Sequence, residues 1–238
     1  MPLIFVVSKG TIPIAQVVTP ETVVSRASAV GHPNAGSALG ITIPRITIDP
    51  RAVQYKQRMQ GGIPEFSFDT GTLRVELQQE VLLSSDLTVC EQRKWGAHER
   101  GHVDDNQDLM DNLEAEVRQY GFFKDVFENG VWYPRTDFQV VQDTINDEIG
   151  SAFRTLTEDA ATHHDTLAEY RRVAREILRD CPAPINYIIQ RGETLSHIAL
   201  HYYGDASKWN LIYDANRAVI GSSPNMIRVG LKIQIPKP

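Results

Sequence analysis

The chain has 238 residues, of which 42% are hydrophobic and 23% are charged, a composition typical of a globular protein with room for a medium domain and a small one. Its formal net charge of -6 at pH 7 argues against a nucleic-acid-binding protein, because phosphates are bound by basic surfaces. No apolar run approaches the roughly 20 residues of a transmembrane helix, so we expect no membrane span.

The N-terminal part, residues 1–84, is predicted to be rich in β-strands. Stretches such as ITIPRITID and TLRVELQQEVLL are β-branched or alternating, and turn residues such as Gly61 and Gly62 separate them. Residues 25–40 are small and polar, which favours a loop. The apolar run at the start is about five residues long with its lysine behind it, so it predicts a strand and no visible Sec-type signal peptide. We therefore expect synthesis in the cytoplasm without a recognisable leader.

Two long helices are predicted to follow. Apolar residues recur at helical spacing from residue 85 to Tyr120, with Ser85 or Asp86 as the N-cap, and again from Asp137 to Arg179. The intervening residues 121–137 predict a connection with a short hairpin at residues 128–130. The fold class is therefore α+β, with residues 1–181 as one domain that is β-rich over 1–84 and helical over 85–181.

A small C-terminal domain is predicted after a proline-rich linker at residues 182–184. Residues 185–238 alternate as strand, helix, helix and strand. The segments GETLSHIA, YYGD, WNLIYDAN and KIQIP closely resemble the LysM family, which implies a small βααβ module.

LysM modules bind N-acetylglucosamine-containing glycans such as peptidoglycan in a groove between two loops, and the resemblance places that groove at Gly192, Glu193, Thr194 and Leu195 together with Asn225, Met226 and Ile227. Other LysM modules serve as adaptors in phage-tail and contractile injection baseplates, and the pattern favours neither role. His197 and His201 lie four residues apart in this domain, but the apolar residues around them suggest two surface side chains.

The stretch His98-Glu99-Arg100-Gly101-His102 lies within the first predicted long helix. On a helix, residues four apart share a face, so two imidazoles can bind one Zn²⁺ while the glutamate accepts a proton from the metal-bound water. Both histidines share the apolar stripe of Trp95 and Leu109, and polar groups facing a core need partners. A pair of buried histidines bonded to carboxylates is the alternative.

A catalytic zinc needs a third protein ligand. His163 lies on the apolar stripe of the second long helix and is the favoured ligand, ahead of Asp105, which shares the face of His98 and His102, and of Glu158. The alternative is that His163 and His164 lie on the surface of that helix. The further candidates are Asp108, Glu114, Glu148, Asp159 and His164.

Residues 40–175 resemble the zincin metallopeptidases, and in particular the bacterial family of predicted secreted zinc-dependent proteases. The resemblance is carried by a β-rich part, then the HExxH helix, then a helix with Thr162-His163-His164. It implies His98, His102 and His163 as zinc ligands and Glu99 as the general base. Tyr170 or Arg154 is a candidate for stabilising an oxyanion.

Cys90 and Cys181 are the only cysteines in the chain. If the two long helices pack antiparallel as continuous rods, the cysteines are offset by roughly 12 Å along the helices, which exceeds the reach of a disulfide. We therefore expect two free thiols, which suit a cytosolic folding compartment.

Three functions are consistent with this pattern. The first is a zinc metallopeptidase tethered to peptidoglycan or to a larger assembly through its LysM module, and it places the protein at the cell wall. The second is an adaptor of a phage-tail-like or contractile injection particle, with baseplate or tail proteins as partners and the HExxH site carried or inactive. The third is a zinc-stabilised binding protein in which Glu99 is idle.

Overall fold

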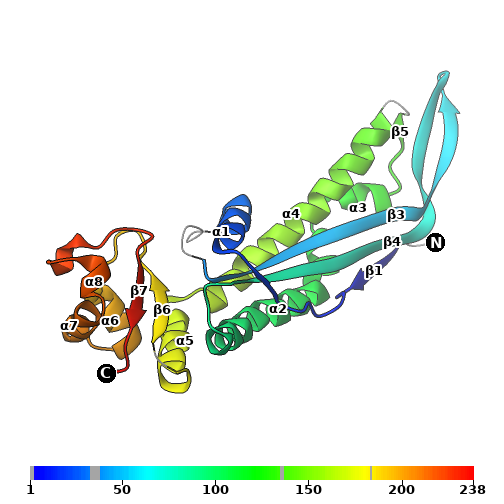
Figure 1. Ribbon diagram of the computed structural model, residues 1–238. Coiled ribbons are helices and arrows are strands. Elements are labelled where there is room, and N and C mark those ends of the chain that lie inside the picture. The colour runs from blue at the N-terminus through cyan, green and yellow to red at the C-terminus, as the bar shows by residue number, and fades with distance from the viewer. Residues whose placement is uncertain (1–2, 33–37, 135–136, 183) are drawn as a thin grey trace. The chain divides into compact units, whose positions relative to one another are not determined.

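The computed structural model describes residues 3–32, 38–134, 137–182 and 184–238, without the side chains at positions 138 and 159–164 (Figure 1). The chain forms two compact units. The first unit comprises Met1–Pro13, Pro44–Gln79 and His102–His163, and the second comprises Ile14–Ile43, Glu80–Gly101 and His164–Pro238.

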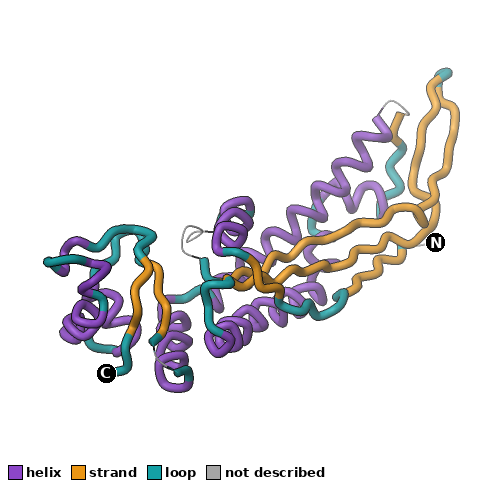
Figure 2. The backbone as a smooth tube through the Cα atoms, viewed as in Figure 1, coloured by secondary structure: helices purple, strands orange, loops and turns teal. Residues whose placement is uncertain are grey.

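A long hairpin organises the N-terminal half of the chain. Strands β3 (Gly40–Gln60) and β4 (Ile63–Ser84) pair side by side (Figure 2). The turn between them is made by Gly61 and Gly62, with φ angles of 58° and 84° that favour glycine over residues with a Cβ. Three short strands also pair with β4. Strands β1 (Ile4–Ser8) and β2 (Gln16–Val18) pair with it in parallel orientation, and β5 (Tyr133–Pro134) pairs with it in antiparallel orientation.

The expectation of a loop over residues 25–40 is wrong in its first part, because helix α1 spans Pro20–Ala29. Thr19 caps this helix by accepting a hydrogen bond from the Thr22 backbone N–H at 3.3 Å, and Pro20 occupies the first turn. Val23 and Ala27 are buried against Ile41, Ile43 and Leu82. The Thr-Pro-Glu-Thr sequence at residues 19–22 was the local signal for this helix.

The core of the first unit lies between its strands and its helices. Side chains of β1, β3 and β4 pack there against α2 (Val89–Val117), α3 (Gly121–Phe127) and α4 (Phe138–His164). Helix α3 occupies the first part of the connection predicted at residues 121–137, where Phe123, Val126 and Phe127 are buried on one face. A helix of this length depends on such packing for its stability.

The second predicted long helix is not continuous. It consists of α4 and α5 (Leu167–Asp180), which are separated at Asp165 and Thr166. Thr166 starts α5 by accepting a hydrogen bond from the Glu169 backbone N–H at 3.2 Å. A capped new start leaves Asp165 outside both helices.

The C-terminal residues of the second unit form the predicted strand–helix–helix–strand module. Strands β6 (Ile185–Ile188) and β7 (Lys232–Ile235) pair antiparallel, and helices α6 (Leu195–Tyr203) and α7 (Trp209–Ala215) lie between them in the chain. A short helix, α8 (Arg217–Ile220), follows α7. One apolar cluster joins this module to α5 and to Leu83, Leu87 and Trp95.

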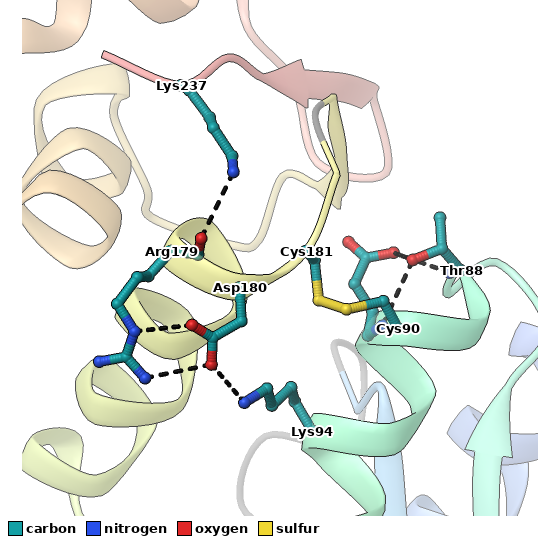
Figure 3. Close-up of a disulfide and its surroundings, with 8 residues drawn as sticks. Thr88, Cys90, Lys94, Arg179, Asp180, Cys181 and Lys237 are labelled. Carbon is teal, nitrogen blue, oxygen red and sulfur yellow. Dashed lines mark hydrogen bonds and ion pairs between the residues drawn. A yellow bond between two sulfur atoms is a disulfide. The ribbon is translucent and has the colours of Figure 1, made fainter.

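Cys90 and Cys181 form a disulfide, so the prediction of free thiols is wrong (Figure 3). Their Cα atoms are 5.6 Å apart. The predicted offset assumed one continuous second helix, whereas the break after α4 lets α5 approach the start of α2 independently. A hydrogen bond of 2.5 Å from Lys94 Nζ to Asp180 Oδ2 lies beside the disulfide.

Candidate functional site

Helix α2 carries the HExxH sequence, and its start is fixed by Thr88 rather than by Ser85 or Asp86 as predicted. The Glu91 backbone N–H donates to Thr88 Oγ1 at 3.3 Å, and the Thr88 backbone N–H donates to Glu91 Oε2 at 2.7 Å. This reciprocal arrangement is a capping box. From this start, helix geometry places His98 and His102 on one face, one turn apart.

The side chain of His98 lies inside the second unit and is only 1% exposed. Its Nε2 atom is 3.9 Å from Asp165 Oδ1, and its Nδ1 atom is 3.9 Å from Glu169 Oε1. The rings of Trp95 and Tyr170 pack against the imidazole with centroid distances of 5.7 Å and 5.4 Å. The inward orientation predicted for His98 is therefore confirmed.

Asp165 reaches this site because the chain turns between α4 and α5. Its Oδ1 atom accepts a hydrogen bond of 2.6 Å from the Tyr170 hydroxyl, and its Oδ2 atom lies 3.9 Å from His32 Nε2. Two histidines and a tyrosine thus surround one carboxylate. The sequence interpretation missed Asp165, although Asp-Thr-x-x-Glu at residues 165–169 is a helix-start signal within the segment assigned to one helix.

Ligand atoms of His98, His102 and Asp165 all lie within 4.8 Å of one another. Tetrahedral zinc with bonds of about 2.0–2.2 Å places neighbouring ligand atoms about 3.3–3.6 Å apart, so atoms as far apart as 4.8 Å would have to approach by about 1 Å to share one ion. Two imidazoles and one carboxylate form a donor set that suits a catalytic zinc. These three side chains could therefore hold a metal ion, and zinc as that ion stays a prediction.

Glu99 is buried against strand β3, with 5% of its surface exposed. Its Oε2 atom accepts a hydrogen bond of 2.8 Å from Thr42 Oγ1. A Cβ atom added to Gly40 would lie 2.8 Å from Glu99 Oε1, so a larger residue at this position would require the carboxylate to move. The sequence interpretation did not identify Thr42 or Gly40, because nothing local connects β3 to α2.

Tyr170, predicted as a candidate oxyanion stabiliser, is at the site but its hydroxyl is engaged with Asp165. Burial, together with that hydrogen bond and the negative charges of Asp165 and Glu99, holds the pKa of Tyr170 well above its usual range. The phenol therefore remains a hydrogen-bond donor at neutral pH. Arg154, the alternative candidate, is exposed and donates to Ser151 Oγ.

The other predicted ligands have different surroundings. The side chain of His163 lies outside the described residues, as do those of Asp159 and His164. Asp105 is half-buried on α2 and is not in the group formed by His98, His102 and Asp165. The roles of His163 and Asp105 as zinc ligands remain predictions. The remaining carboxylates are exposed or engaged elsewhere: Asp108 and Glu158 are exposed, Glu114 accepts from Arg118, and Glu148 accepts from the Phe123 backbone N–H.

The predicted glycan-binding loops differ in accessibility. Gly192, Thr194, Asn225 and Met226 are exposed, and Ile227 is half-buried. Leu195 is only 4% exposed within the apolar core, and Glu193 accepts hydrogen bonds from the Tyr187 hydroxyl at 2.6 Å and the Gln190 backbone N–H at 2.8 Å. Leu195 and Glu193 therefore shape the loop, and the exposed residues offer the surface.

His197 and His201 were both expected at the surface, and only His197 is exposed. His201 is half-buried, and burial together with the charges of Arg171 and Arg175 lowers its pKa from 6.5 to about 4. Because the two arginines lie on α5, His201 belongs to the packing between α5 and the C-terminal module.

Comparison with known families supports one part of the chain. Residues 187–236 match the LysM domain, in agreement with the sequence resemblance. No match was found among curated proteins, and none among solved structures. The likeness of residues 40–175 to zincin metallopeptidases is matched by no family model and stays a prediction. Within the described part of the chain, no helix is long and apolar enough to cross a membrane.

Proposed function

We propose that the protein is a zinc-dependent peptidase that its LysM domain holds on peptidoglycan or another N-acetylglucosamine-containing glycan. The observation that carries the catalytic part is the convergence of His98, His102 and Asp165, with the buried Glu99 directly after His98 on the same helix. The LysM domain at residues 187–236 supports the glycan part. Tethering an enzyme to its substrate layer raises its effective concentration there.

The residues of the site have distinct roles in this proposal. His98, His102 and Asp165 hold the metal, with His163 as the competing third ligand. When bound, zinc supplies Lewis acidity and lowers the pKa of its water towards neutrality. With the metal bound, Glu99 would act as the general base, and the hydrogen bond from Thr42 would keep its carboxylate in place.

The disulfide supports a site of action outside the reducing cytoplasm. Disulfides persist in oxidising compartments, and the bond between Cys90 and Cys181 joins the HExxH helix to the end of α5. The bacterial cell wall, where peptidoglycan is found, is such an environment.

Metal content tests the catalytic proposal. After dialysis against zinc-free buffer, elemental analysis of the wild type should give one zinc per chain, and His98→Ala should lose it. Asp165→Ala and His163→Ala separate the two candidate third ligands, because only the true ligand is needed for binding. A wild-type protein that takes up no zinc would refute the metal site.

Turnover is tested with Glu99→Gln, which should keep zinc and lose hydrolysis of protein or peptidoglycan stem peptides by about 10²–10⁴-fold. If wild type and variant hydrolyse equally, Glu99 is not the base. If zinc is bound and neither protein hydrolyses these substrates, the result favours a zinc-stabilised binding protein over a peptidase.

Glycan binding is tested by sedimentation with purified peptidoglycan. The exposed Met226→Asp variant should bind less, whereas Val219→Asp, also exposed on this domain but away from the two loops in sequence, should bind as the wild type does. Full binding by Met226→Asp would remove the loops from the site. If the wild type fails to sediment, the adaptor role in a particle gains over the glycan-binding role.

A further inference from the structure

The structure places a second carboxylate behind the buried metal-ligand candidate His98. We propose that Glu169 is a positioning residue that accepts a hydrogen bond from His98 Nδ1–H and so directs the lone pair of Nε2 to the metal. This inference rests on the proposed metal site, and it assigns Glu169 a role that the HExxH pattern does not contain.

The two nitrogens of His98 face two different carboxylates. Nδ1 lies 3.9 Å from Glu169 Oε1, and Nε2 lies 3.9 Å from Asp165 Oδ1. A neutral imidazole carries one N–H, and an ionised carboxylate only accepts hydrogen bonds. If Asp165 binds the metal together with Nε2, the proton of the ring must be on Nδ1, where Glu169 is the acceptor. The present separation is about 1 Å longer than a typical N–H···O hydrogen bond, so the proposed bond requires the two side chains to approach by that distance when the metal binds.

The aromatic neighbours restrict other orientations of the imidazole. Trp95 packs edge to face against it, with an interplanar angle of 87°, and Tyr170 packs at 46°. The ring is thus held in one plane, within which its two nitrogens point to Asp165 and Glu169. Partners of this kind fix the tautomer of a metal-binding histidine and increase its basicity.

Glu169 is itself fixed in place. Its Oε2 atom accepts a hydrogen bond of 2.9 Å from Arg172 Nε, and Arg172 Nη2 contacts Oε1. On the other side of its carboxylate, Glu169 Oε1 lies beside His98 Nδ1. This arrangement points to a role at the site in addition to the helix start.

The chain offers a matched control for this role. Glu176 lies two turns further along α5 and also contacts Arg172, through Nη1. The two glutamates have similar exposure, 22% for Glu169 and 29% for Glu176. His98 therefore distinguishes them, because only Glu169 lies beside its ring.

The test measures the zinc affinity of the full chain by competition with a chromophoric chelator. Glu169→Met keeps the length of the side chain but removes the acceptor, and it should weaken zinc binding by about 10–100-fold. Glu169→Gln retains an uncharged acceptor and should lie between Glu169→Met and wild type. Glu176→Met should bind zinc within about twofold of wild type.

Thermal unfolding of the zinc-free proteins separates positioning from folding. The zinc-free Glu169→Gln variant should unfold at the wild-type temperature, so that its weaker zinc binding reports on the site alone. Equal zinc affinity in wild type and both Glu169 variants would overturn the proposal, as would an equal loss in Glu176→Met. Complete loss of zinc in both Glu169 variants would make Glu169 a ligand instead.

These outcomes are separable from failure of the proposed function. A wild type without zinc affinity would refute the metal site and this inference together. Zinc binding by the wild type, unchanged in the Glu169 variants, would refute the positioning role alone. Zinc binding without hydrolysis would refute the peptidase, while the affinities would still decide the role of Glu169.

Discussion

Removing the Cys90–Cys181 disulfide should destabilise the protein substantially. The bond closes a loop with a sequence separation of 91 residues, and it joins the start of α2 to the end of α5. In the chain-entropy description, a loop of this length lowers the entropy of the unfolded state by about 15 cal/mol/K, or about 4.6 kcal/mol at 25 °C. Native disulfides of small domains typically contribute about 2–5 kcal/mol, so we expect a loss within that range.

The variant to compare is the double substitution Cys90→Ala with Cys181→Ala. Alanine avoids burying a hydroxyl at Cys181, which is 1% exposed. Chemical denaturation should show a lower free energy of unfolding for the double variant than for the oxidised wild type. Treatment with a phosphine reductant should bring the wild type down to the double variant and leave the double variant unchanged.

Two results would contradict this reasoning. One is the detection of two free thiols per chain, by thiol labelling under denaturing conditions, in protein produced in an oxidising compartment. The other is a free energy of unfolding in the double variant within about 1 kcal/mol of the oxidised wild type. In that case the packing between α2 and α5 would hold without the covalent link.

Substitutions at Thr42 and Gly40 test the surroundings of Glu99, and one at His201 tests the packing between α5 and the C-terminal module. Thr42→Val removes the hydrogen bond to Glu99 and should reduce hydrolysis while the zinc content stays unchanged. Thr42→Ser keeps the hydroxyl and should hydrolyse as the wild type does. Equal rates in Thr42→Val and wild type would exclude this role for Thr42. Gly40→Ala places a Cβ 2.8 Å from Glu99 Oε1 and should lower hydrolysis in the same assay, and an unchanged rate would show that the position of the carboxylate does not depend on this glycine. The pKa of His201 is lowered from 6.5 to about 4, mainly by burial, so its neutral form stabilises the fold above pH 6.5 and this contribution is lost as the pH falls towards 4. His201→Gln should flatten that pH dependence in denaturation measurements, and an unchanged slope would assign it to other groups.

Much of the organisation around the site follows from local pattern. The helical spacing of Trp95, His98 and His102 predicts a buried face of α2, and the structure confirms it for Trp95 and His98. The LysM segments predict the C-terminal module in the same way. These predictions succeed because periodicity and capping depend on residues only a few positions apart.

The errors came from places where the chain turns. The sequence pattern predicts one continuous helix through residues 165–166. In the structure, α5 begins anew after Thr166, which places Asp165 and Glu169 beside His98 and Cys181 next to Cys90. The apolar residues on the two sides of residues 165–166 keep nearly the same helical spacing, so their pattern alone does not reveal the break between the two helices.

The sequence by itself therefore determined which helix carries His98, Glu99 and His102, and which domain follows the prolines. Only the tertiary structure decided which residues from β3 and α5 meet that helix. The physical reason is that spacing along one helix is set by its 3.6-residue turn, whereas contacts between segments far apart depend on the direction of every intervening turn. One capped break of two residues added Asp165 to the candidate third ligands, allowed the disulfide to form and brought Glu169 to the buried imidazole.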